Sequence, residues 1–544
     1  MNSISWIDTS IIVLFLVFTI TYALNKRKNK DEVGYFLAGK NENWFVVGLS
    51  LFAASVSSTT LIGNSSEGFI SGITVFNYNI GSVFVMIFIA VFFIPFYIKT
   101  GIYTIPEYLK CRYDRRSSTY FSFITIVGNI FLDAAAALYT GALILKVIFP
   151  ELNTMHVIWI IALIAGFYTI VGGLSSAIHA DIIHSFVLII GSIILSFYCM
   201  HEIGGWNELM SRFNDGVWMS LIRPASDPTM PWIAIIVSLP ILGFYFWGNN
   251  QIMVQRILSA KTIDHGRKGL LFVAFIYLFT LFIFILPGVI ARGINIFGIE
   301  LPKEIISGET LRNTYGINTN EVYPRLIMKL LPVGMMGILL AAMISALTSA
   351  LCGTLNSVST LFTMDFYRHF NKKADGKQLV KVGQITSFVA LIIAVLWAPF
   401  IGKFSSLVSY YQEFISYIAP PVVSAFLLGL FWKRSNSHGA FAGLIAGLVV
   451  ALVVTCFKYG FHITIPIHFL LWAPILFIIS SSMNIIVSLM TRKPSVESIE
   501  KNTWNKTLFI EDLNEHKAIV WYKNFYILAF LLIIFTIIEY IIFW

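Results

Sequence analysis

Apolar stretches of about 20 residues recur along the whole chain, and they dominate what it can fold into. A helix needs roughly 20 apolar residues to cross the ~30 Å hydrocarbon layer of a bilayer. With 57% hydrophobic and only 12% charged residues, the chain lies far from the composition of soluble domains. The sequence therefore predicts an all-α polytopic membrane protein with fourteen transmembrane spans. Their limits are 6–25, 43–66, 74–98, 119–148, 154–174, 180–201, 232–255, 269–296, 332–362, 379–400, 406–431, 438–458, 464–490 and 520–543.

The distribution of lysine and arginine predicts how these spans are oriented. Cytoplasmic loops of membrane proteins are enriched in both residues. If the N-terminus is outside, the predicted cytoplasmic segments carry 27 of the 37 lysines and arginines; they are 25–42, 97–118, 256–268, 364–381, 432–437 and 491–523. An even number of spans returns the C-terminus to the outside. The net charge of +9 then reflects membrane topology and does not indicate nucleic-acid binding.

Motifs of soluble catalysis are absent from the sequence. It contains no Walker loop, dinucleotide fingerprint, zinc motif or catalytic-triad spacing. Its four cysteines are widely scattered and have no metal-type spacing; they are Cys111, Cys199, Cys352 and Cys456. We therefore expect neither an enzyme nor an ATP-driven pump, and any transport must draw on an ion gradient.

One apolar span is interrupted by short polar side chains. Between Leu51 and Gly68 the interruption consists of Ser55, Ser57, Ser58, Thr59, Thr60, Asn64, Ser65 and Ser66. Such side chains compete for backbone hydrogen bonds, and irregular backbone at membrane depth is tolerated only around a polar cavity or inside protein. This span is therefore predicted to be a broken helix at a binding site inside the membrane.

The order of the spans predicts an internal repeat. Without the first helix and the last three, ten spans remain, and they divide into two sets of five. Five is an odd number of crossings, so the second set would be inverted, as in secondary transporters whose first repeat helices are broken. The second opening helix, at about 232–255, contains Gly243, Gly248, Asn249 and Asn250, although membrane glycines also serve close packing. The predicted units are 1–42, 43–202, 203–431 and 432–544.

A stripe of hydroxyls in the span 332–362 completes this set of features. Ser345, Thr348 and Ser349 stand at positions i, i+3 and i+4, a spacing that places them on one helix face. Hard cations prefer oxygen ligands, and hydroxyls together with opened backbone carbonyls can supply them. The alternative is that these hydroxyls only bond to the carbonyl one turn back or to a neighbouring helix.

Five motifs in matching order resemble the sodium/solute symporters, most closely their bacterial sodium/galactose cotransporter branch. They are GIYTIPEY at 101–108, GGLSSA at 172–177 followed by Asp181, YFWGNNQ at 245–251, LNS at 355–357 with FTMD at 362–365, and FLLGLFWKR at 426–434. The resemblance implies a leucine-transporter-type fold with five-plus-five inverted repeats. It also implies a bacterial inner-membrane location and symport of a small solute with Na⁺, which is the coupling ion, without any other cofactor.

The resemblance carries over a sodium site residue by residue. The expected ligands are the carbonyls of Ala53 and Val56 and the hydroxyls of Ser345, Thr348 and Ser349. Asp181 is expected to line the sodium exit path, or alternatively to cap or pair in the adjacent loop. A second sodium site of some relatives needs hydroxyls where this chain has Leu351 and Cys352. We therefore expect one sodium ion per cycle.

The solute positions depart from the sugar branch in an informative way. Tyr78, Ser82 and Gln412 match that branch. Four others differ: Asn79 replaces a glutamate, Thr60 a glutamine, Gly243 an asparagine and Tyr277 a lysine. Phe246 replaces the tyrosine of the inner gate. Since paired charged and amide groups recognise polyols, these losses favour a different sugar, modified sugar or neutral polyol over galactose.

Alternatives remain open at this point. Sialic acid is one, because Ser57 and Thr60 lie where relatives bind its carboxylate, but the span 119–148 lacks the arginine those relatives supply. Asp133 in that span is either protonated and hydrogen-bonded between helices or part of a cation or solute path. Glu413 is expected to be solvated at the outer end of its helix. Proton coupling through His179 and His184, a solute sensor and a channel are further alternatives.

Overall fold

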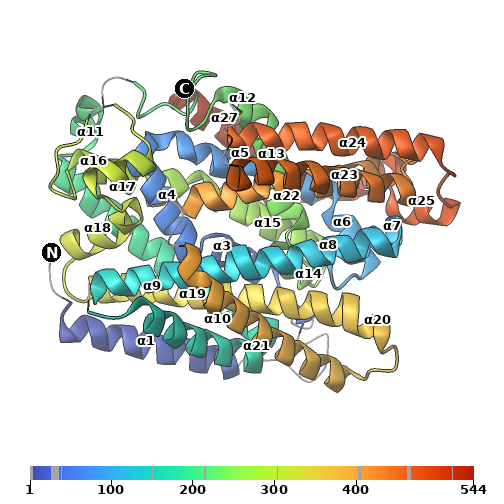
Figure 1. Ribbon diagram of the computed structural model, residues 1–544, viewed down its shortest axis with the longest axis horizontal. Helices are drawn as coiled ribbons and strands as arrows, with labels where there is room; N and C mark the ends of the chain where they lie inside the picture. The colour runs from blue at the N-terminus through green and yellow to red at the C-terminus, as the bar shows by residue number, and fades with distance from the viewer. Residues whose placement is uncertain are drawn as a thin grey trace.

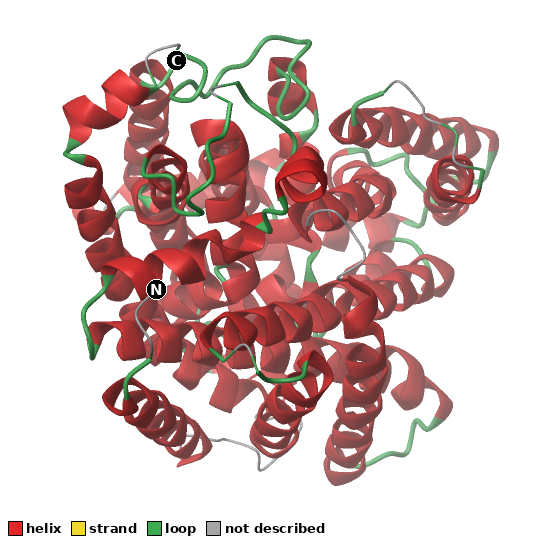
Figure 2. Ribbon diagram, turned by 60° about the vertical axis from the view of Figure 1, so that its left-hand side comes forward, coloured by secondary structure: helices red, strands yellow, loops and turns green. Residues whose placement is uncertain are grey.

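The computed structural model describes residues 4–25, 36–37, 40–149, 151–213, 216–302, 304–401, 407–461, 463, 467–517 and 519–544, and its elements there are all helical (Figure 2). The first half contains α1 (Trp6–Asn25), α3 (Trp44–Ser55), α4 (Ser58–Ser71), α5 (Asn77–Phe92), α6 (Ile94–Thr100), α7 (Ile105–Arg112), α8 (Arg115–Gly128), α9 (Ala135–Ile148), α10 (Thr154–Ile203), α11 (Trp206–Arg212), α12 (Trp232–Val237), α13 (Leu239–Phe244) and α14 (Gln251–Leu258). The second half contains α15 (Ile263–Leu278), α16 (Leu286–Gly293), α17 (Gly308–Tyr315), α18 (Val322–Leu330), α19 (Met335–Leu361), α20 (Arg368–Phe370), α21 (Gly376–Ile401), α22 (Leu407–Phe431), α23 (Ser437–Thr455), α24 (Trp472–Met490), α25 (Val496–Asn502), α26 (Lys506–Lys517) and α27 (Phe525–Ile542). Short 3-10 or π turns are η2 (Gly72–Phe76), η3 (Asn129–Ala134), η4 (Tyr245–Asn249), η5 (Leu281–Ile285), η6 (Thr319–Glu321), η7 (Phe362–Tyr367), η8 (Cys456–Gly460), η9 (Phe469–Leu471) and η10 (Trp521–Lys523).

Ten described helices are long and apolar enough to cross a membrane, or eleven if the bent pair 263–278 and 281–293 is one span. That pair is bent by 48°. Shorter apolar helices lie at 6–22, 44–55 and 154–167. The all-helical membrane architecture is confirmed, while the count of fourteen crossings, the five-plus-five division and the four predicted units remain predictions.

The bundle has two ends, and the chain termini lie toward the same one. The N-terminus lies at the left-hand end of Figure 1 with α11, α17 and α18, whereas α7, α20 and α25 lie at the right-hand end. Near the C-terminus, the carbonyl of Phe543 accepts a hydrogen bond from the Leu221 backbone N–H at 2.8 Å. This bond joins the end of α27 to the segment between α11 and α12.

The two halves of α10 run in opposite directions past α19. In its first half, Ile161 and Leu347 meet beside Gly141, and Gly166 lies against Leu391. In its second half, Ala177 and Ala180 cluster with Cys352, and Gly191 lies against Leu339. The first half thus follows α19 toward its C-terminus, and the second half returns toward its N-terminus. This agrees with the predicted separate spans 154–174 and 180–201.

Two helix breaks occur where polar residues interrupt apolar helices. The first break separates α3 from α4 at Val56, whose φ and ψ are −105° and 71°, and at the extended Ser57, which caps α4. The second separates η4 from α14 at Asn250, whose backbone is extended and whose side chain accepts from the Ile252 N–H. Both breaks lie inside the segments predicted from serine, threonine, glycine and asparagine.

The helix after the first break is held in place by a close crossing. A Cβ added to Gly288 of α16 would lie 2.0 Å from the Ser65 carbonyl oxygen of α4, and one added to Gly68 would lie 2.5 Å from the Ile285 carbonyl oxygen. These distances are far below van der Waals contact. The two helices therefore cross backbone to backbone, as glycine-mediated packing in membranes allows.

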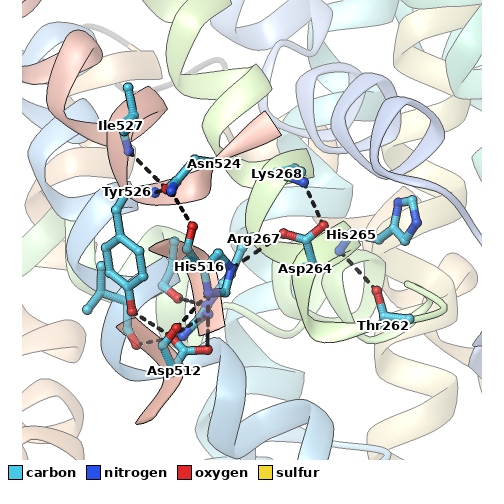
Figure 3. A network of polar contacts seen from close by, with 12 residues as sticks. Thr262, Asp264, His265, Arg267, Lys268, Asp512, His516, Asn524, Tyr526 and Ile527 are labelled. Carbon is cyan, nitrogen blue, oxygen red and sulfur yellow. Dashed lines mark hydrogen bonds and ion pairs between the residues drawn. The ribbon is translucent and has the colours of Figure 1, made fainter. Parts of the chain in front are cut away.

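Polar contacts fasten the C-terminal helices to α15 (Figure 3). Arg267 of α15 is buried, and its guanidinium donates to both Asp512 carboxylate oxygens of α26 at 2.9 and 3.0 Å and to the Ala90 carbonyl at 3.0 Å. The Tyr526 hydroxyl of α27 donates to the same carboxylate at 2.5 Å. α26 and α27 are thus part of the packed structure.

The carboxylate of Asp227, in the segment before α12, is hydrogen-bonded by neighbouring residues of the same segment. It accepts from the Thr229 N–H at 2.8 Å, the Thr229 hydroxyl at 2.6 Å and the Met230 N–H at 2.9 Å, and it lies 3.6 Å from the Arg223 guanidinium. Burial alone would raise the pKa of Asp227, but these hydrogen bonds and the Arg223 charge outweigh burial and hold its pKa below the ordinary value.

Candidate functional site

A cavity of about 210 Å³ lies where the two broken helices meet. The residues predicted to contact the solute and the predicted inner gate all line it: Thr60, Tyr78, Asn79, Ser82, Gly243, Tyr277, Gln412 and Phe246. They come from α4, α5, α13, η4, α15 and α22. The structure thus brings these positions together around one cavity, and their individual roles remain predictions.

Several polar side chains of the cavity wall already donate hydrogen bonds within the protein. Thr60 donates to the Ser55 carbonyl at 2.9 Å, and Ser82 donates to the Tyr78 carbonyl at 2.6 Å. Asn79 donates from its amide nitrogen to the Thr280 hydroxyl at 3.0 Å. A hydroxyl that has donated its proton offers its oxygen as an acceptor. The wall is therefore suited to a solute that donates hydrogen bonds.

Aromatic rings form another part of the wall. Trp247 packs edge-on against Phe246 with ring centroids 5.1 Å apart and against Tyr277 with centroids 5.3 Å apart. All three rings line the cavity. Such rings provide rigid apolar area with polar tips on Trp and Tyr, which suits a solute with both C–H faces and hydroxyls.

The predicted sodium ligands lie among three mutually packed helices, α3, α10 and α19. Ala53 and Val56 are buried at the C-terminal end of α3. The Thr348 hydroxyl donates to the Ile344 carbonyl at 2.7 Å, and the Ser349 hydroxyl donates to Asp181. Since donation leaves oxygen lone pairs available, neither bond prevents a hydroxyl from ligating a cation.

Ser345 and Thr348 also face a small void behind the predicted sodium site. Thr19 of α1 and His184 of α10 line this void with them. The Ser345 hydroxyl is buried and has no hydrogen-bond partner within the described residues. The hydroxyl stripe therefore spreads around α19, with Ser349 directed toward Asp181 and Ser345 toward α1 and α10.

Asp181 lies at the centre of a buried polar cluster. Its carboxylate accepts from Ser50 of α3 at 2.7 Å and from Arg256 of α14 at 3.1 and 3.2 Å, in addition to Ser349 of α19. Arg256 also donates to Ser50 at 3.0 Å. The side chains of Asp181 and Arg256 are 0% and 1% exposed. The cluster ties both broken helices to the hydroxyl stripe.

This pairing bears on the two roles expected for Asp181. The partner is an arginine just beyond the second helix break, and it does not belong to the loop beside Asp181. Arg256 was not among the predicted site residues. From the sequence it is only one of the positive charges of the predicted cytoplasmic segment 256–268. A role of Asp181 in the sodium exit path remains a prediction, and sodium leaving by that path would meet a carboxylate already paired with Arg256.

The start of α22 links the cavity to two other helices through consecutive residues. Tyr411 is hydrogen-bonded to Asp133, and both line the cavity with Gln412. Glu413 is 7% exposed and accepts from Tyr417 at 3.0 Å and from Lys458 of η8 at 2.6 Å. The expectation that Glu413 is solvated is wrong, because a lysine from the C-terminal helices reaches it.

Several other residues of the cavity wall were given no solute role from the sequence, among them Asn64, Trp247, Thr354 and Tyr411. Asn64 belongs to the polar cluster of the first broken helix, and Trp247 belongs to the YFWGNNQ motif, so both carried a usable signal. Thr354 stands nine residues after Ser345 on α19, and Tyr411 precedes Gln412; nothing in their local sequence distinguishes them.

Comparison with known proteins decides the family. A model of the sodium:solute symporter family matches residues 35–447. The chain belongs to the sodium:solute symporter family. It is 32% identical over 526 residues to sodium/glucose cotransporter 1 of Sus scrofa, covering 89% of this chain and 79% of that protein. It is 31% identical over 548 residues to the sodium/myo-inositol cotransporter of Bos taurus, covering 92% and 75%.

Solved structures agree on the fold of this symporter. A substrate-bound, outward-open Na⁺-coupled sialic acid symporter aligns with a TM-score of 0.77 at 22% identity, covering 90% of this chain and 99% of that one. A nucleobase-cation-symport-1 family transporter in a closed conformation aligns with a TM-score of 0.51 at 13% identity, covering 86% and 97%. These neighbours have the leucine-transporter-type fold.

Family membership confirms several expectations. The protein is a sodium-coupled membrane transporter and not an enzyme, and sodium is its coupling ion without an indicated cofactor. The motif-based assignment to the sodium/solute symporters is therefore confirmed. The solute is left open by these comparisons, because the relatives transport different compounds.

Proposed function

We propose that this symporter imports a sugar or a related polyhydroxylated solute together with Na⁺ by alternating access. The observation that supports this most is the cavity at the two helix breaks, whose described wall combines hydroxyls, amides and aromatic rings with a single carboxyl group. Relatives named for glucose and myo-inositol support the same solute class. The partners are then the solute, Na⁺ and the lipid bilayer.

In this proposal, sodium bridges the first broken helix and the hydroxyl stripe. The carbonyls of Ala53 and Val56 and the hydroxyls of Ser345, Thr348 and Ser349 hold the ion. Sodium then favours the outward-open form, and its different affinity for the two forms couples it to the solute. Phe246 closes the inner side of the cavity, and sodium leaves past Asp181 toward the cytoplasm.

The proposal includes the membrane arrangement expected from the charge distribution. Fourteen helices cross a bacterial plasma membrane, with the two five-helix repeats at 43–202 and 203–431 and both termini outside. The extra N-terminal helix lies within 1–42, and 432–544 adds three helices. The common end of the two termini in the bundle supports an even number of crossings.

Sialic acid, or another organic solute of the same family, is the second candidate solute. It is favoured by one observation, namely that Ser57 and Thr60 line the cavity in a fold shared with a sialic acid symporter. Against it, no lysine, arginine or histidine is found among the described cavity-lining residues. An anionic solute would lack a counter-charge in this wall.

Uptake by purified protein in liposomes tests the proposal. Radiolabelled glucose, galactose, myo-inositol and sialic acid are supplied with an inward sodium gradient or with equal sodium on both sides. We expect gradient-dependent accumulation of a neutral polyol. Accumulation of the acid alone, or accumulation driven by a proton gradient without sodium, would refute the proposed solute or coupling ion.

A matched pair of serine variants tests the sodium site in the same assay. Ser345→Ala is expected to raise the sodium concentration for half-maximal uptake about tenfold, the loss of roughly one ligand interaction. Ser359→Ala, about four turns further along α19, removes an equally buried hydroxyl outside the site and is expected to leave that concentration unchanged. If Ser345→Ala and Ser359→Ala needed the same sodium concentration for half-maximal uptake, the assignment of Ser345 as a sodium ligand would be overturned.

A further inference from the structure

The three hydroxyls of the predicted sodium site differ in what holds their protons. Thr348 donates to the Ile344 carbonyl at 2.7 Å, and Ser349 donates to Asp181. The Ser345 hydroxyl is buried and has no hydrogen-bond partner within the described residues. A buried hydroxyl without a partner costs free energy, and buried polar groups in native proteins are nearly always paired. Ser345 therefore needs an acceptor on the side away from the ion.

The void behind Ser345 offers groups that complete this bond. It has a volume of about 10 Å³ and lies between α1, α10 and α19, which pack against one another. Both ring nitrogens of His184 in α10 are buried and lack a hydrogen-bond partner in the described part of the chain. The residues around the void are Leu16, Thr19, Ile20, Ala180, His184, Ser345 and Thr348.

The polar groups of this lining match the hydrogen bonds of one water molecule. A buried water needs roughly 10–15 Å³ and makes about three hydrogen bonds. The Thr19 hydroxyl donates to the Phe15 and Leu16 carbonyls, each at 3.0 Å, so its oxygen is available as an acceptor. An uncharged imidazole has one acceptor nitrogen. A water that accepts from Ser345 and donates to Thr19 and His184 thus makes three hydrogen bonds.

A cation would match the same lining less well. A cation is held by acceptor atoms alone, so it would leave the Ser345 proton without an acceptor. None of the described residues around the void has a carboxylate to favour a second positive charge beside the sodium ion. The void is therefore suited to a neutral molecule that both donates and accepts.

We propose that Thr19 and His184 are positioning residues of the sodium site. They hold one buried water that accepts the Ser345 proton, and this bond turns the lone pairs of the Ser345 oxygen toward the ion. The inference rests on the proposed function, since it concerns the sodium site of the same symporter. It gives α1, the helix before the two predicted repeats, a role in binding the coupling ion.

Binding of radiolabelled sodium to the purified symporter without solute tests this inference independently of transport. Thr19→Val removes a hydroxyl at nearly constant shape, and His184→Leu removes both ring nitrogens. Each is expected to raise the Kd for sodium about fivefold to tenfold, the effect of one lost hydrogen bond. His184→Gln keeps a donor and an acceptor and should bind sodium as tightly as wild type.

Two controls separate positioning from a general effect on the structure. Thr536 of α27 is also buried and donates to the carbonyl one turn back at 2.8 Å, so Thr536→Val should leave the Kd unchanged. In the Ser345→Ala background, His184→Leu should raise the Kd no further, because the hydroxyl through which His184 acts is gone. A further rise as large as in wild type would overturn the positioning role. Two bound sodium ions per protein, falling to one in Thr19→Val, would also overturn it, since the void would then hold a cation.

The outcomes distinguish this inference from the proposed function. A raised Kd in Ser345→Ala, with unchanged values in Thr19→Val and His184→Leu, would overturn the inference and leave the sodium site in place. An unchanged Kd in Ser345→Ala would refute the sodium site and the inference with it. The expected binding without sodium-driven accumulation in liposomes would instead refute symport and keep the positioning role.

Discussion

The buried pair of Asp181 and Arg256 should be the most sensitive polar contact in the bundle. Asp181 accepts four hydrogen bonds from Ser50, Ser349 and Arg256, and both members of the ion pair are almost fully buried. Removing one partner of a buried ion pair typically costs about 3–5 kcal/mol, because the other charge is left without compensation. Asp181→Asn and Arg256→Met are each predicted to lower the free energy of unfolding by this amount.

The double variant provides the sharper comparison. When both charges are removed, no uncompensated charge remains, so Asp181→Asn with Arg256→Met should lose at least about 2 kcal/mol less than the sum of the single changes. Unfolding by sodium dodecyl sulfate in mixed micelles measures these free energies. Lys501→Met serves as a control, since its ion pair with Glu497 is solvent-exposed and its loss should cause no measurable change.

The same pair should influence sodium binding, because Ser349 donates to Asp181. Asp181→Asn weakens this orienting bond and is predicted to raise the sodium concentration for half-maximal uptake about tenfold. If the loss of unfolding free energy in the double variant equalled the sum of the two single losses within about 0.5 kcal/mol, the pairing would be refuted. Wild-type sodium dependence in Asp181→Asn would refute its link to the sodium site.

Three further predictions follow from contacts elsewhere. Gly288→Ala should destabilise the protein by at least about 2 kcal/mol in the same micelle assay, because the new Cβ has no room against α4; an unchanged stability would refute the close crossing. Lys458→Met should raise the half-saturating solute concentration about fivefold without changing sodium dependence, because it releases Glu413 beside Gln412; an unchanged solute dependence would separate the C-terminal helices from the cavity. Because the pKa of Asp227 is lowered in the fold, its contribution to stability is complete above its ordinary pKa of 3.8 and is lost as the pH falls through the lower folded value. The difference in melting temperature between wild type and Asp227→Asn should therefore shrink as the pH is lowered from 7 to below 3.8, and a difference that does not shrink would refute this contribution.

The sequence predicts the site better than it predicts the contacts that hold the site together. Broken helices are visible in sequence because backbone opening needs short polar residues or glycine, as at Ser57 and Asn250. The predicted cavity positions came from the resemblance to the sugar branch, and the structure places them around one cavity. The family and the fold class of its solved neighbours follow from motifs in a matching order.

Long-range partners were not predictable in the same way. Arg256 and Asp181 are separated by 75 residues, and a positive charge near a helix end is expected in any cytoplasmic loop. Lys458 and Glu413 are 45 residues apart; Lys458 lies in η8 directly after α23, and the packing of α23 against α22 brings the two residues together. Local patterns report burial and backbone conformation, whereas ion pairs between helices depend on how the helices pack.

Current measurement on supported membranes tests the coupling of sodium to a neutral polyol most directly. Proteoliposomes containing the symporter are exposed to a sudden rise in solute concentration, with sodium or choline as the only cation. A transient inward current is expected in sodium and none in choline, because each neutral solute carries a sodium charge with it. An equal current in choline with a proton gradient, or no current in sodium with any neutral polyol that the protein binds, would contradict this coupling.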